Sequence, residues 1–117
     1  MRKTLQTKFG KNGNCFAACV ASITHKKIED VPQFEECGAD GSWFTLLKEW
    51  CKANKYAIDY TFITPRGYSI ACGKTSKYKR VKHACVYLNG KLCFDPHPSD
   101  EDGLVSVDYY ITLRKHA

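Results

Sequence analysis

The sequence predicts an α+β fold in which N-terminal helices pack on a C-terminal antiparallel sheet. Apolar residues recur at helical spacing in the first half of the chain, whereas apolar and polar residues alternate from position 56 onward. The dipeptide Asn89-Gly90 separates two alternating runs and is the strongest hairpin signal in the chain. Because helices come first and strands follow, the two kinds of element are segregated along the chain, as in α+β proteins.

Two helices are predicted in the first half. Asn14 is a good N-cap residue for a helix over residues 14–24, where apolar side chains return every three or four positions. Ser42 is in the same position for a second helix over residues 42–54, which carries an apolar stripe. Residues 28–41, which lie between them, contain proline and glycine and predict a short helical turn and a loop.

The second half predicts strands. Residues 56–62 alternate strictly between the two faces, and residues 67–73 form a shorter candidate. Residues 83–96 hold the two arms of the Asn-Gly hairpin, and residues 104–115 complete the sheet.

Length and composition indicate one domain. At 117 residues the chain can bury a hydrophobic core, so we expect a single domain over residues 1–117. No apolar run approaches the roughly 20 residues that span a bilayer, and no apolar stretch of signal-peptide length follows the basic N-terminus. We therefore expect a cytoplasmic protein with no membrane partner.

The seven cysteines are expected to be reduced thiols. None of them forms a CxxC pair, which is the spacing on which structural zinc sites normally draw. The sequence therefore predicts no metal and no cofactor. Most of these cysteines are expected to act as small buried hydrophobes.

Cys15 lies at a position where a cysteine can act as a nucleophile. It follows Gly13 and Asn14 and stands in the first turn of the predicted helix. A thiol at this end of a helix experiences the partial positive charge of free N–H groups, which favours the thiolate and hence a nucleophile. A neighbouring imidazole would complete the activation and later protonate the leaving group.

His83 is the candidate for that imidazole. His25 lies at the far end of the same helix, roughly 15 Å from the thiol at 1.5 Å per residue. His97 stands in a loop between two prolines, and His116 is in the terminal tail. His83 opens a strand that leads through the hairpin to Asp95, so a carboxylate could orient the imidazole as in a Cys–His–Asp triad.

The segments "GNCFAACVASI" and "VKHACVYLNGKLCFDPHPS", in this order, resemble the papain-like cysteine peptidase superfamily, particularly its bacteriocin-processing members and compact phage-encoded relatives. The resemblance implies a papain-like α+β fold and a hydrolase that cleaves an amide, peptide or isopeptide bond in a peptide or protein substrate. Cys15 would be the nucleophile, His83 the proton carrier and Asp95 the orienting group. The resemblance also implies a Gln before the nucleophile that completes an oxyanion hole. Gln6 is the candidate, and Asn14 is the substitute.

A basic segment supports an alternative from another class. Eighteen basic and twelve acidic residues give a net charge of +6. Part of the excess lies in residues 74–82, where the candidate contacts are Lys74, Lys77, Lys79 and Arg80. The alternative is a non-catalytic binding protein on a papain-like scaffold that engages a host protein or nucleic acid through this loop. No nucleic-acid motif accompanies the basic segment.

The triad requires a particular hairpin register. A two-residue Asn-Gly turn would pair Leu88 with Lys91 and place His83 and Asp95 on opposite faces of the sheet. A three-residue loop with Gly90 in a bulge would instead pair Tyr87 with Lys91, and Cys85 with Cys93. We predict the bulged register, with His83 and Asp95 on one face and within hydrogen-bond reach.

Overall fold

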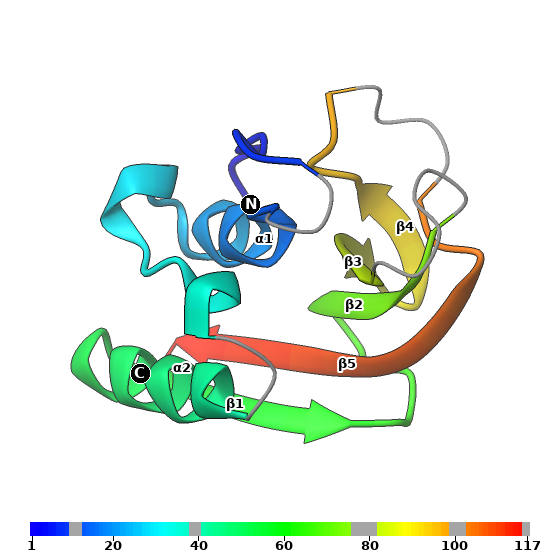
Figure 1. The fold of residues 1–117 in the computed structure, drawn as a ribbon. Coiled ribbons are helices and arrows are strands. Elements are labelled where there is room, and N and C mark those ends of the chain that lie inside the picture. The colour runs from blue at the N-terminus through cyan, green and yellow to red at the C-terminus, as the bar shows by residue number, and fades with distance from the viewer. Residues whose placement is uncertain (10–12, 38–40, 76–81, 99–102, 116–117) are drawn as a thin grey trace.

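The computed structural model describes residues 1–9, 13–37, 41–75, 82–98 and 103–115. Within these residues the chain forms two α-helices, two short 3₁₀ helices and five strands (Figure 1). In chain order the elements are α1 (Cys15–Thr24), η2 (Ile28–Asp30), η3 (Phe34–Cys37), α2 (Ser42–Ala53), β1 (Tyr56–Thr61), β2 (Tyr68–Lys74), β3 (Lys82–Leu88), β4 (Lys91–Phe94) and β5 (Ser106–Lys115). The predicted α+β class is confirmed.

The strands form one antiparallel sheet in the order β1-β5-β2-β3-β4. The last strand of the chain, β5, therefore lies inside the sheet, between the edge strand β1 and the central strand β2, and Figure 1 shows it as the longest strand. No helix in the described ranges has the length and apolar character needed to cross a bilayer.

Helix α1 is buried on nearly all sides. It packs on β3 and β2, with η2 and η3 against it, and the N-terminal segment runs along it through hydrogen bonds to Ser22. Five consecutive small or medium side chains are completely buried: Ala17, Ala18, Cys19, Val20 and Ala21. Small side chains allow the backbone of a central helix to approach its neighbours closely, because little volume separates the elements.

Helix α2 packs on β1 through aromatic side chains. Trp50 stacks on Tyr56 with ring centroids 6.4 Å apart, and Trp43 stacks on Tyr109 of β5 at 6.5 Å. The helix begins at Ser42, but its N-cap residue is Gly41, with φ of +86°. The predicted capping role of Ser42 is therefore wrong by one position, because the left-handed conformation at the helix start suits glycine.

The hairpin between β3 and β4 has the tight turn, so the predicted three-residue loop is wrong. Leu88 pairs with Lys91, and Asn89 and Gly90 both have positive φ, as a type I′ turn requires. The register then shifts, because Tyr87 pairs with Leu92 whereas Val86 pairs with Phe94.

Cys93 is the extra residue of this bulge, and the expected pairing of Cys85 with Cys93 is absent from the ladder. One inserted residue in a strand moves each side chain that follows it to the opposite face of the sheet. The bulge therefore restores the common face for His83 and Asp95 that the tight turn alone would remove.

A second irregularity lies where β2 meets β5, and it gives a stability prediction. The register shifts between Cys72 and Gly73, and a Cβ atom on Gly73 would collide with the backbone carbonyl of Ser106. We expect Gly73→Ala to lower the free energy of unfolding by about 3 kcal/mol, because backbone must move to admit the methyl group.

Gly41→Ala is the matched control, since it has positive φ but open space around its Cα, and it should cost only about 1 kcal/mol. Urea unfolding of both variants makes the comparison. Equal losses of unfolding free energy in the two variants would contradict the close approach of β5 to Gly73.

Candidate active site

Cys15 occupies the first position of α1, as predicted, and Asn14 is the N-cap residue. The side chain of Asn14 does not cap the helix. Instead, the helix end is capped from a distant part of the chain. The Glu35 carboxylate accepts hydrogen bonds through Oε2 from the N–H of Phe16 at 2.7 Å and of Ala17 at 3.4 Å. An acidic side chain in this position offsets the partial positive charge of the helix N-terminus.

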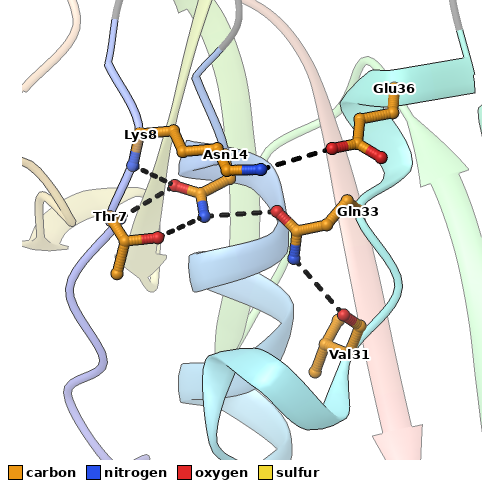
Figure 2. A network of polar contacts seen from close by, with 6 residues as sticks. All are labelled: Thr7, Lys8, Asn14, Val31, Gln33 and Glu36. Atoms are coloured by element: carbon orange, nitrogen blue, oxygen red, sulfur yellow. Dashed lines mark hydrogen bonds and ion pairs between the residues drawn. The ribbon is translucent and has the colours of Figure 1, made fainter.

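Asn14 holds the N-terminal segment against the start of α1 (Figure 2). Its Oδ1 accepts from the N–H groups of Thr7 and Lys8, both at 2.9 Å. Its Nδ2 donates to Thr7 Oγ1 at 2.8 Å and to Gln33 Oε1 at 3.2 Å. Because both donors and both acceptor positions of a carboxamide are then occupied within the protein, this network argues against the predicted oxyanion role of Asn14.

Gln6, the other predicted oxyanion donor, is buried beside the loop that follows β4. Its backbone N–H donates to Pro96 O at 3.0 Å, and its side-chain Nε2 donates to Lys8 O at 2.8 Å. Gln6 is absent from the described residues that line the pocket at Cys15. Its oxyanion role stays a prediction.

His83 and Asp95 meet as predicted. His83 Nε2 lies 2.7 Å from Asp95 Oδ1, and the two side chains are 3% and 0% exposed. Asp95 also accepts from the N–H of His97 at 2.9 Å through Oδ1, and from the N–H of Gly103 at 3.2 Å through Oδ2. Backbone donors of this kind stabilise an ionised carboxylate, so Nε2 is the ring nitrogen that carries a proton toward Asp95.

Cys15 and His83 line one pocket. The cavity has a volume of about 170 Å³, and its walls are formed by Cys15, Phe16, Phe34, Glu35, Trp43, Cys72, Lys82, His83, Ala84 and Tyr109. Among the described residues, strand β4 pairs with Val86–Leu88 of β3. The backbone N–H of Ala84, which precedes this paired part of β3, faces the Cys15 sulfur. Because Nε2 of His83 is bonded to Asp95, Nδ1 is the ring nitrogen that remains for another partner.

The thiol of Cys15 is protonated in this environment. Burial, with a further contribution from the charge of Glu35, raises its pKa from 9.0 to about 12, although backbone N–H groups of Ala84 and Phe16 act in the opposite direction. The thiolate expected from the helix N-terminus is therefore not favoured in the resting protein. Burial of the thiol is the main cause, and Glu35 adds to it because its carboxylate has taken the helix N–H groups and brings a negative charge close to the sulfur.

The remaining predicted contacts belong to the basic segment. Lys74 is exposed at the end of β2. Lys77, Lys79 and Arg80 lie outside the described residues, so the structure does not bear on a binding surface there.

One cluster has the residue types of a metal site. Ligand atoms of His83, Cys85 and Asp95 lie within 4.8 Å of one another, and all three residues are buried. Tetrahedral zinc with bonds of about 2 Å would hold nitrogen and oxygen ligands roughly 3.3 Å apart. The 2.7 Å contact between His83 and Asp95 is a direct hydrogen bond that leaves no space for an ion between them. We therefore assign the cluster to orientation of the imidazole.

The sequence analysis missed Glu35 and the aromatic walls of the pocket. Glu35 is one of two adjacent glutamates, and no local pattern distinguishes it from Glu36. Its capping contact joins residues 19 apart in the chain, and the phenyl ring of Phe34 packs edge to face on Phe16 at 5.7 Å. Such long-range contacts have no signature in a single sequence.

No family model matches the sequence, and no curated protein or solved structure shows significant similarity to the chain.

The position of Glu35 predicts how the reactivity of Cys15 depends on pH. Because a nearby negative charge disfavours the thiolate, Glu35→Gln should lower the pKa of Cys15 and shift its alkylation profile toward lower pH. Between about pH 7 and pH 10, iodoacetamide should label Cys15 faster in this variant than in the native protein.

Glu36→Gln is the matched control, because it removes the same charge from an exposed residue that pairs with Lys8. Mass mapping of Cys15 gives the rates. Equal acceleration in the two variants would mean that Glu35 does not act on the thiol.

Proposed function

We propose that this protein is a papain-like cysteine hydrolase that cleaves an amide, peptide or isopeptide bond. The observation that carries the proposal is the shared pocket of Cys15 and His83, with Asp95 bound to the far ring nitrogen of the imidazole. A nucleophile, a base and an orienting group in this arrangement are the parts of a catalytic triad. No metal or cofactor enters the proposed reaction.

The protonated thiol determines the first step. Since the pKa of Cys15 is raised, His83 Nδ1 removes the thiol proton as the sulfur attacks the carbonyl carbon of the substrate. The tetrahedral intermediate then expels the amine, which takes the same proton from His83, and a thioester remains on Cys15. Water attacks the thioester and gives its proton to Nδ1, and the acid product leaves as the thiol is restored.

Two groups of contacts support these steps. Asp95 fixes the imidazole through Nε2 and stabilises the positive charge that forms on the ring. The backbone N–H of Ala84 faces the Cys15 sulfur, close to where the carbonyl oxygen of a bound substrate would develop charge, whereas the N–H of Phe16 is already bound to Glu35. The aromatic side chains that line the pocket lower the polarity around the thiol and so strengthen both interactions.

Covalent trapping tests the proposal. Peptidyl acyloxymethyl ketones, which capture nucleophilic cysteines as thioethers, should label Cys15, and mass mapping identifies the site. His83→Ala should slow labelling at least about 100-fold, because it removes the base. Cys93→Ala is the matched control: Cys93 is also half-buried, and its loss should leave labelling unchanged.

Slow labelling spread evenly over the cysteines, and insensitive to His83, would contradict the hydrolase. That outcome would favour the non-catalytic binding protein on the same scaffold.

A further inference from the structure

The pocket beside Cys15 contains a carboxylate oxygen without a protein partner. Glu35 Oε2 is held by the helix N–H groups, whereas Oε1 is buried and receives no hydrogen bond from the described residues. Leaving a buried acceptor unsatisfied costs roughly 1–3 kcal/mol, and more when the group is charged. Since Glu35 lines the cavity, a bound group with a hydrogen-bond donor could satisfy this oxygen.

The charge of Glu35 is not compensated within the pocket. Lys82 also lines the cavity, but its ammonium group lies 2.6 Å from the Asp108 carboxylate, and both side chains are substantially exposed. These two charges cancel each other close to the surface. The carboxylate of Glu35 is more deeply placed, on the end of the helix, and its charge acts on the Cys15 thiol, although burial raises the pKa of Glu35 itself.

The other walls of the cavity suit a cation. Phe16 packs edge to face on Trp43 at 5.4 Å, and Trp43 stacks on Tyr109 at 6.5 Å. Together with Phe34, these aromatic residues line the cavity. Aromatic faces attract alkylammonium and guanidinium groups, and the attraction is larger where water is excluded.

The size of the cavity indicates a single side chain. Its volume of about 170 Å³ is close to the ~150 Å³ that accommodates one benzene molecule in an apolar protein cavity. This space fits the end of a lysine or arginine side chain and is too small for an extended segment.

We propose that this pocket selects a basic side chain, of the lysine or arginine type, adjoining the acyl group that Cys15 attacks. The cation would sit between the aromatic walls and donate to Glu35 Oε1. This inference rests on the proposed function, because it assigns a substrate class to the same site.

The test uses methanethiosulfonates, small thiol reagents that differ in charge. Each reacts when the cysteine sulfur attacks the sulfenyl sulfur, which forms a mixed disulfide and releases methanesulfinate. The trimethylammonioethyl reagent is the cationic form, and the sulfonatoethyl reagent is the anionic one. The ratio of their rates at Cys15, divided by the ratio at half-buried Cys93 in the same molecules, measures the charge preference of the pocket.

We expect the native protein to favour the cation about tenfold at Cys15 relative to Cys93, given an unscreened carboxylate within a few ångströms. Glu35→Gln should abolish the preference, and Glu36→Gln, which changes net charge equally, should retain it. A native ratio equal to that of Cys93 would overturn the proposal, even if the Glu35 variant does not fold. An equal loss of the charge preference in the Glu35→Gln and Glu36→Gln variants would overturn the proposal as well.

These outcomes are independent of catalysis, because mixed-disulfide formation involves no acyl transfer and the dependence on the thiolate, common to both reagents, cancels in the ratio of their rates. Charge preference without trapping by acyloxymethyl ketones would contradict the hydrolase and leave a cation-binding pocket. Trapping without charge preference would contradict only the substrate class.

Discussion

The hydrogen bond between His83 and Asp95 is the contact on which the candidate site depends. It joins two completely or almost completely buried polar groups, 12 residues apart, and each would be costly to bury without the other. The bond exists because the bulge at Cys93 corrects the face of the strand after a tight Asn-Gly turn. The same carboxylate fixes the following loop through the N–H groups of His97 and Gly103. Orientation of the imidazole and placement of His97 and Gly103 therefore depend on the same carboxylate.

Much of this arrangement follows from local sequence patterns. The α+β order and the position of Cys15 at the start of α1 were predictable, because periodicity and chain order determine them. The proximity of His83 to Asp95 was predicted from the Cys–His–Asp triad and not from periodicity. The hairpin register that brings the two residues together was not predicted correctly. The Asn-Gly dipeptide strongly favours a two-residue turn, and that local preference prevailed. The compensating bulge lies at Cys93, where packing on both faces of the hairpin decides the position, and no turn residue marks it.

The environment of the Cys15 thiol also could not be predicted from local sequence patterns. A helix N-terminus favours a thiolate, but Glu35 occupies the N–H groups of Phe16 and Ala17, and burial disfavours any charge on the sulfur. Asn14, which suits an N-cap, instead binds Thr7, Lys8 and Gln33 and so fixes the chain that precedes the nucleophile (Figure 2). Glu35 therefore caps the helix in place of Asn14, and Asn14 fixes the N-terminal segment instead, because partners from distant segments compete with local hydrogen bonds.

The central claim is that Asp95 holds His83 with Nδ1 free to accept the proton of Cys15. Nitrogen-15 NMR of the imidazole tests it most directly, because the two ring nitrogens have distinct shifts when only one carries a proton. The account predicts that in the resting protein the proton is on Nε2 and Nδ1 is unprotonated, and that Asp95→Asn disturbs this tautomer while Asp108→Asn does not. A proton on Nδ1 of His83 in the resting native protein would contradict the account.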